Sequence, residues 1–215
     1  MNPPALFSRR FFPALLLLVP ALVMIPSGCD VVPPAQLDQT RFYVLTGPEP
    51  APAEGGTLRV GLCAVRLPAY LKSPLMIVRR GANEVAPQDY ARWAEPLDAG
   101  IARVLRAQLR ATPGVGQLYQ QPFPLDRDRD YDLMIEIIRC EGSTANGRPV
   151  AQFTAAYEIS TAGNDPHVVA RKTFVAREIA WDGRDFGRLA ADLSQDVASF
   201  GREAAAALPV GVPTR

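Results

Sequence analysis

Two stretches of the chain repeat apolar side chains every three to four residues, the spacing that brings side chains to one face of a helix. The first ends before Thr112-Pro113-Gly114 and has its apolar positions at Leu97, Ile101, Val104, Leu105 and Leu109. The second runs from Asp185 to Leu208, and its stripe consists of Phe186, Leu189, Leu193, Val197, Phe200, Ala204 and Leu208. Asp182 and Asp185 are its candidate N-caps. The pattern predicts two amphipathic helices, each burying one face.

Segments rich in β-branched and aromatic residues, several of them alternating with a period of two, predict strands. Turns at Asn146-Gly147 and at residues 163–166 connect the last three closely, as in an antiparallel meander. The order of elements predicts an α+β fold, with a mostly antiparallel sheet and both amphipathic helices packed on one face. In chain order the predicted strands are Arg41–Thr46, Thr57–Val65, Leu75–Arg79, Val85–Tyr90, Gly116–Gln121, Leu133–Cys140, Val150–Ile159 and Val168–Ile179.

The first residues have the pattern of an export signal. Arg9 and Arg10 precede the apolar run Phe11–Ile25, which is shorter than the ~20 residues that span a bilayer. Small residues then lead to Cys29 and resemble the bacterial lipobox, in which that cysteine is lipidated and becomes the mature N-terminus. The alternative is an ordinary secretion signal followed by a stray cysteine. We therefore expect residues 1–28 to be a lipoprotein signal peptide.

After the export signal, the sequence predicts three parts: a Pro-rich tether, a folded domain and a short tail. Residues 29–40 hold the candidate lipidated Cys29 and a Pro-rich tether, which reaches at most about 35 Å when extended. Residues 41–208 carry every predicted helix and strand and are expected to form a single α+β domain, and residues 209–215 are expected to be a disordered tail. Asp30, directly after the cysteine, resembles a signal for retention in the inner membrane.

Charge and cysteine content exclude several function classes. The net charge is +1, and without the two arginines of the leader 21 basic residues face 22 acidic ones, so no basic surface favours nucleic acid. Beyond Cys29 the chain has Cys63 and Cys140, on two predicted strands. They are either small buried hydrophobes or a disulfide, which an oxidising compartment permits. The absence of a Cys-x-x-Cys motif argues against a redox enzyme.

Few residues suit catalysis or metal binding. The alternating aspartates of Asp126–Asp132 lack the glycine of a calcium loop and have Ile137 at its twelfth position, so we expect a solvated loop with internal ion pairs. His167, the only histidine, lies in a turn beside Asp165. The chain contains neither a Walker A motif nor a nucleophile elbow. We therefore expect no metal and no cofactor.

Four carboxylates near the first helix leave one catalytic alternative open, a glycosidase-like pair. A favourable interaction with the helix dipole explains those next to the helix start better, and we expect a protein that is not an enzyme. The four are Glu84, Asp89, Glu95 and Asp98.

The segment from Arg79 to Trp93 combines arginines with aromatic residues, the side-chain types that dominate protein–protein interfaces. It is a candidate docking site. Each residue has a structural alternative: the two arginines before the turn suit a solvated rim, and a tryptophan just before a helix could staple that helix to the sheet. The candidate residues are Arg79, Arg80, Asn83, Tyr90, Arg92 and Trp93.

Three motifs in this part of the chain resemble the PqiC/YmbA family, the auxiliary lipoproteins of ABC-type transport systems. They are Leu67-Pro68-Ala69-Tyr70-Leu71, Arg80-Gly81-Ala82-Asn83-Glu84 and Arg92-Trp93-Ala94-Glu95-Pro96-Leu97. The resemblance covers roughly Arg41 to Leu208.

The resemblance implies a non-catalytic lipoprotein on the periplasmic face of the outer membrane, with the inner membrane as the alternative because of Asp30. Its partners would be an MCE-domain protein, which carries lipid between membranes, and the associated ABC transporter. The resemblance also implies self-assembly into a homo-oligomeric ring. Two other functions remain open, a lipid-binding carrier and an assembly lipoprotein of another envelope machine.

Overall fold

The computed structural model describes residues 37–48, 50–144 and 147–209. It divides the chain into two units, Met1–Asp38 and Gln39–Arg215. Of the first unit only Leu37 and Asp38 are described, both exposed. The predicted signal peptide, Cys29, most of the tether and the tail after Pro209 lie outside the described residues and stay predictions. The fold below is that of the second unit.

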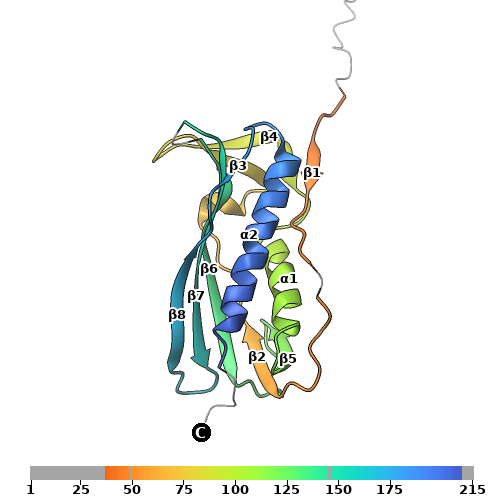
Figure 1. Ribbon diagram of the computed structural model, residues 1–215, viewed down its shortest axis with the longest axis vertical. Helices are drawn as coiled ribbons and strands as arrows, with labels where there is room; N and C mark the ends of the chain where they lie inside the picture. The colour runs from red at the N-terminus through yellow and green to blue at the C-terminus, as the bar shows by residue number, and fades with distance from the viewer. Residues whose placement is uncertain (1–36, 49, 145–146, 210–215) are drawn as a thin grey trace, which may run out of the picture. The chain divides into compact units, whose positions relative to one another are not determined.

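One mixed sheet and two α-helices make up the unit, so the predicted α+β fold is confirmed (Figure 1). Both predicted helices form within two residues of their expected ends, as α1 (Leu97–Arg110) and α2 (Phe186–Ala206). A short 3₁₀ helix, η1, spans Ala69–Lys72. The strands are β1 (Arg41–Tyr43), β2 (Leu58–Leu62), β3 (Leu75–Arg79), β4 (Val85–Trp93), β5 (Val115–Gln120), β6 (Tyr131–Ser143), β7 (Val150–Thr161), β8 (Val168–Val175) and β9 (Ile179–Ala180).

The longest strand, β6, is the centre of the sheet. One of its edges pairs with β7 in antiparallel register, and β7 in turn pairs with β8 and β9. This confirms the predicted meander. The other edge of β6 is shared by two parallel neighbours, β2 near Tyr131–Leu133 and β3 at Gly142 and Ser143. The sheet then continues from β3 to β4 in antiparallel register, from β4 to β1 in parallel, and from β2 to β5 in parallel.

Several strand boundaries differ from the prediction: β1 ends three residues earlier, at Tyr43, and β6 continues three residues further, to Ser143. β4 continues to Trp93 rather than ending at Tyr90, because pairing with β1 holds its last residues in the sheet. β2 ends at Leu62, although the chain still follows β6, where the Arg66 N–H donates to the Ile135 carbonyl at 2.9 Å. The predicted strand Val168–Ile179 is two strands, β8 and β9. Its alternation breaks where Arg177 and Glu178 are both exposed.

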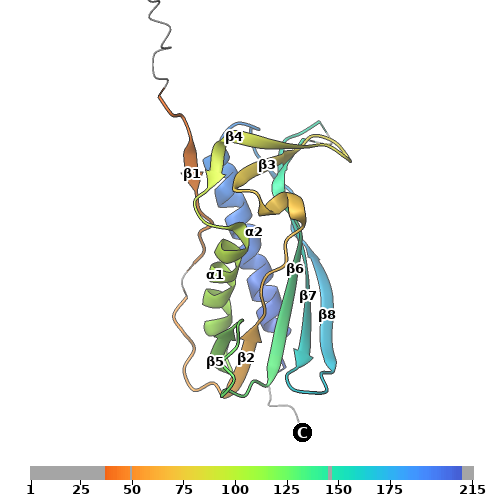
Figure 2. The same cartoon turned by 180° about the vertical axis from the view of Figure 1, so that it is seen from behind.

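Both helices pack against each other and on one side of the sheet (Figures 1 and 2). The predicted apolar stripes face inward: Ile101 and Leu105 on α1, and Leu189 and Phe200 on α2, are at most 1% exposed. The ring of Phe200 lies 5.7 Å from that of Phe153 on β7 and 5.6 Å from that of Phe174 on β8. Closely packed aromatic rings therefore fill the layer between α2 and the meander.

Two predictions about single residues are settled by local contacts. The carboxylate of Asp185 accepts a hydrogen bond from the Arg188 N–H at 3.0 Å, which confirms Asp185 as the N-cap of α2. Cys63 and Cys140 are free thiols and form no disulfide with each other. Burial raises the pKa of both thiols.

Candidate functional site: an aromatic and arginine surface on β1 and β4

The pairing of β1 with β4 assembles an exposed surface. Phe42 pairs with Arg92, so their side chains lie on one face of the sheet, and Tyr90 is on the same face two residues earlier. Phe42 is 65% exposed and Tyr90 is 63% exposed. The alternate residues of β4, Ala91 and Trp93, face the core. We call Phe42, Tyr90 and Arg92 the β1–β4 surface.

Arg92 is the polar member of this surface. Its side chain is half-buried, and its Nε has no hydrogen-bond partner in the part of the chain that the structure describes. It also makes no ion pair with a described carboxylate. A guanidinium that is partly withdrawn from water and lacks an acceptor is costly, and a carboxylate or carbonyl of a partner would lower that cost.

Trp93 is not part of this surface. It is 7% exposed and belongs to the core, and its backbone N–H donates to the Pro74 carbonyl at 2.8 Å. This position agrees with the alternative in which tryptophan staples α1 to the sheet, since α1 begins only four residues later at Leu97.

Arg79 serves the fold. Its Nε donates to the buried carboxylate of Glu141 at 2.5 Å, and its guanidinium lies over the ring of Tyr70, 5.6 Å from the centroid. A further hydrogen bond to the Ala82 carbonyl, at 3.2 Å, ties the β3–β4 turn to β3. The hydrogen bond to Glu141 raises the pKa of Arg79, while burial and then the Glu141 charge raise that of Tyr70. These contacts occupy Arg79 within the molecule.

Arg80 and Asn83 lie in the exposed turn between β3 and β4. Arg80 faces Glu84 at 3.9 Å with both side chains mostly in water, a pair that contributes little to stability. Arg92 is at the opposite end of β4, where it pairs with Leu75 at the start of β3, whereas Arg80 and Asn83 follow the end of β3. The structure thus brings Tyr90 and Arg92 together and separates them from Arg80 and Asn83.

Phe42 is the residue that sequence reasoning missed. Phe42 to Leu45 are all apolar, so the sequence does not show which of these side chains faces outward; in the structure Val44 is 46% exposed and Leu45 is buried. Only the pairing of β1 with β4 places Phe42 beside Tyr90 and Arg92.

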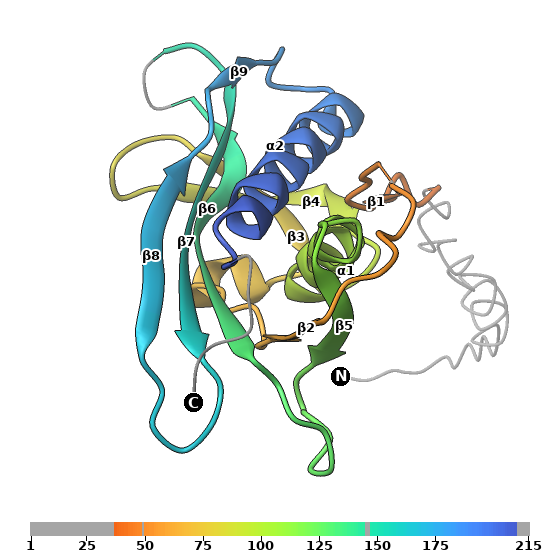
Figure 3. The same cartoon turned by 60° about the horizontal axis from the view of Figure 1, so that its bottom comes forward.

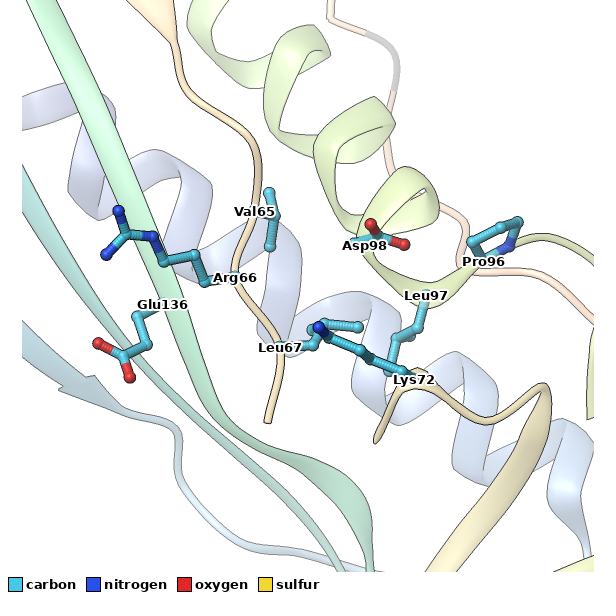
Figure 4. Close-up of a pocket in the computed structure, with 8 residues that line it drawn as sticks. All are labelled: Val65, Arg66, Leu67, Lys72, Pro96, Leu97, Asp98 and Glu136. Carbon is cyan, nitrogen blue, oxygen red and sulfur yellow. The ribbon is translucent and has the colours of Figure 1, made fainter. Parts of the chain in front are cut away.

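A cleft of about 630 Å³ opens between the segment after β2, η1 and the first turn of α1. Its apolar side is formed by Val65, Leu67 and Leu97, and the charged residues are Arg66, Lys72, Asp98 and Glu136. Asp98 projects from α1 and Glu136 from β6, on opposite sides of the segment that carries Val65 and Leu67 (Figure 4).

Two of the four carboxylates singled out from the sequence, Glu84 and Glu95, have arginine partners. Glu95 pairs with Arg103 at 2.5 Å, and Arg103 also donates to the Leu45 carbonyl at 2.8 Å. Asp98 lies in the first turn of α1, where the helix dipole favours a negative charge. Among the described residues, no group of three or more His, Cys, Asp or Glu side chains is placed to hold a metal ion.

Comparison with known proteins places the chain in a family. The family model of the ABC-type transport auxiliary lipoprotein component matches residues 43–205. The chain belongs to this family. Members of this family are auxiliary lipoproteins associated with ABC-type transport systems, and they are transport components rather than enzymes. As a lipoprotein, the chain is attached to a membrane of the cell envelope. In the described part of the chain, no helix is both long and apolar enough to cross a bilayer.

Solved structures share the fold at low sequence identity. A DUF330-family protein from Xanthomonas campestris is 22% identical with a TM-score of 0.64, over 77% of this chain and 93% of that one. An uncharacterised protein is 20% identical with a TM-score of 0.55, over 76% and 97% of the two chains. At these identities the likeness shows the fold alone. No curated protein matches the chain.

Proposed function

We propose that this protein is a non-catalytic lipoprotein of an intermembrane lipid transport system, in which it docks an MCE-domain partner of the ABC transporter. Family membership supports the transport role, and the resemblance at Arg80–Glu84 and Arg92–Leu97 supports the MCE-type system. The observation that carries the docking role is the β1–β4 surface, where two mostly exposed aromatic rings flank an arginine without an ion-pair partner among the described residues.

The composition of the β1–β4 surface suits recognition. Tyrosine and arginine are enriched among residues that contribute most to binding, and large aromatic side chains bury much area at a low entropic cost. Fully burying a side chain such as Phe42 is worth about 1.5–3 kcal/mol. A partner carboxylate facing Arg92 would add a charge-assisted hydrogen bond. The surface could therefore supply several kcal/mol to a protein–protein contact.

The position of the surface in the chain agrees with a membrane-anchored dock. Phe42 follows Cys29 by 13 residues, so an extended chain reaches at most about 45 Å from a lipidated Cys29 to the surface. In this mechanism Cys29 attaches the domain to the periplasmic face of the outer membrane, the tether limits its height, and the β1–β4 surface binds the partner.

Co-purification with the MCE-domain partner tests the docking role. We expect Tyr90→Ala and Arg92→Glu to weaken binding at least about tenfold, equivalent to about 1.4 kcal/mol. The control is Val168→Ala, at a residue 53% exposed on β8, away from the surface. Thermal unfolding must show that each variant is folded. If folded Tyr90 and Arg92 variants co-purify as the unchanged protein does, the docking role of this surface is wrong.

A further inference from the structure

The cleft beside η1 contains an open edge of backbone. β2 lies between β6 and β5, and β5 leaves the sheet after the Gln121 N–H donates to the Leu62 carbonyl at 3.0 Å (Figure 3). The Gln121 side chain still covers Ala64, whose N–H donates to its Oε1 at 3.0 Å. Residues 65–67 come next, and no described strand pairs with them on the side away from β6. We call residues 65–67 the open edge.

Peptide geometry fixes which groups of the open edge are free. The Arg66 N–H donates to the Ile135 carbonyl at 2.9 Å, and the Arg66 carbonyl accepts from the Ile137 N–H at 2.8 Å. In a trans peptide the C=O and the following N–H point in opposite directions. The Val65 carbonyl and the Leu67 N–H therefore point away from β6, and neither has a hydrogen-bond partner among the described residues.

These two free groups border the cleft, whose volume of about 630 Å³ is typical of ligand sites. Val65 is 8% exposed, so its carbonyl has little access to water, and Leu67 is partly buried. Buried backbone donors and acceptors are almost always paired in folded proteins, because an unpaired one is costly. A free carbonyl and a free N–H on either side of one residue are the groups that a neighbouring strand would pair with.

Lys72 is the free charge of the cleft. It extends from η1, is exposed, and makes no ion pair with a described carboxylate. The other charges are offset. Arg66 and Glu136 are register partners of opposite sign on the β6 side (Figure 4), and Asp98 lies in the first turn of α1, where the helix dipole favours a negative charge. A negatively charged ligand would therefore meet Lys72 without displacing an existing ion pair.

We propose that the cleft binds an extended peptide segment with an acidic side chain, which belongs to a protein subunit of the same transport complex and pairs with the open edge as an added strand. This inference rests on the proposed function. The main chain of the segment donates to the Val65 carbonyl and accepts from the Leu67 N–H, and its acidic side chain faces Lys72. In strand addition, main-chain hydrogen bonds give affinity and side-chain contacts give specificity.

Two of the three motifs that carry the family resemblance meet at this cleft. Leu67 begins the first motif, and Pro96 and Leu97 end the third. Lys72 directly follows the first motif. The sequence that marks the family thus surrounds the open edge, which favours a partner from the transport complex over an unrelated one.

Hydrogen-bonding capacity argues against an acyl chain as the occupant. An acyl chain would cover the apolar side chains of Val65, Leu67 and Leu97. It would also leave the Val65 carbonyl and the Leu67 N–H unpaired and remove water from the Lys72 ammonium, and both effects are unfavourable. A peptide segment pairs with all three groups.

Hydrogen exchange at a single amide tests the added strand. The full lipidated chain and the purified transport complex are reconstituted in vesicles of phosphatidylethanolamine and phosphatidylglycerol, and exchange is read residue by residue with mass spectrometry. We expect the Leu67 amide to exchange at least about tenfold more slowly in the complex than in the chain alone. The Arg66 amide, which already donates to β6, is the internal control and should change little. Unchanged exchange at Leu67 in the bound chain overturns the inference.

Crosslinking tests the kind of occupant in the same vesicles. A photo-crosslinking amino acid replaces Asp98 at the cleft, with the same replacement of Arg177, exposed between β8 and β9, as the matched control. We expect position 98 to crosslink to one segment of a protein subunit and position 177 not to. Crosslinking of position 98 to lipid, or to nothing, overturns the inference.

Affinity measurements separate this inference from the proposed function. We expect Lys72→Glu to weaken binding to the complex at least about tenfold, and Lys72→Arg and the control Arg177→Glu to preserve it. If Lys72→Glu binds as the unchanged protein does while Tyr90→Ala binds weakly, the cleft contact is wrong and the docking role stands. If the unchanged protein does not bind the complex, both are wrong.

Discussion

Two buried carboxylates on α2 stand out at the scale of single residues. Asp192 and Asp196 are 1% and 6% exposed. Asp192 accepts hydrogen bonds from the Arg188 guanidinium at 2.9 and 3.0 Å, whereas Oδ2 of Asp196 has no hydrogen-bond partner among the described residues. Burial, together with the nearby charge of Asp192, raises the pKa of Asp196 to about 6. At neutral pH the fold therefore holds an unfavourable buried charge.

Replacing Asp196 should remove this cost. Since the pKa is higher in the folded than in the unfolded chain, the folded state is favoured at low pH and loses stability as the pH rises from about 4 to about 6. We expect Asp196→Asn to increase the free energy of unfolding at pH 7 by about 1–2 kcal/mol, and to have little effect near pH 4. Urea unfolding at pH 4, 5.5 and 7 measures the difference.

The exposed Asp165 provides the matched control, because Asp165→Asn should leave the pH dependence as it is. Equal effects of Asp196→Asn at pH 4 and pH 7 would contradict the raised pKa.

At the scale of elements, the start of the β2–β5 pair depends on two glycines in close approach. A Cβ on Gly116 would lie 2.1 Å from the backbone oxygen of Gly56, and a Cβ on Gly56 would lie 2.5 Å from the carbonyl oxygen of Val115. Neither contact can be relieved by turning a side chain. The parallel pairing of these two strands therefore requires glycine at both positions.

We expect Gly116→Ala to destabilise the fold by about 2–4 kcal/mol, because the backbone of β2 or β5 must shift. Gly81→Ala is the matched control, since a Cβ there meets no atom within 4 Å, and we expect it to be neutral or slightly stabilising. Thermal unfolding of the two variants makes the comparison. A Gly116→Ala variant as stable as Gly81→Ala would show that the two strands approach less closely.

At the scale of the whole molecule, the proposed function requires a durable attachment to a membrane. Several acyl chains on Cys29 would provide it, at about 0.8 kcal/mol per buried CH₂, whereas one chain holds only marginally. We expect Cys29→Ala, exported with an ordinary cleavable secretion signal in place of residues 1–28, to move the protein from the membrane fraction to the soluble periplasmic fraction without changing its fold. Fractionation and the mass of the N-terminal peptide measure this outcome. A Cys29→Ala variant that stays in the membrane fraction would contradict the lipid anchor.

The retention signal that Asp30 resembles gives a second prediction at this scale. We expect the unchanged protein to sediment with outer-membrane vesicles on a density gradient. The opposite outcome is that the unchanged protein sediments with the inner membrane and that Asp30→Ser moves it to the outer membrane. In that case Asp30 acts as a retention signal, and the protein docks its partner from the inner membrane.

The docking site shows how far sequence reasoning reached. The predicted segment Arg79–Trp93 includes Tyr90 and Arg92, which the structure places on one strand face although the predicted strand ended at Tyr90. Their role in docking stays a prediction. The segment also grouped with them a core tryptophan and an arginine committed to Glu141. Residue type and spacing do not reveal burial at a strand end, because burial depends on elements distant in the chain, such as β1 and β6.

Local sequence pattern was enough to predict the two helices, the N-cap at Asp185 and the meander β6–β7–β8. Each depends on side chains within one or two turns or across a short connection, whose spacing is written in the chain. Tertiary structure decided that β2 and β3 share one edge of β6 and that β1 joins β4. Parallel pairing between distant segments follows from packing of the whole core, and that packing alone places Phe42 beside Arg92.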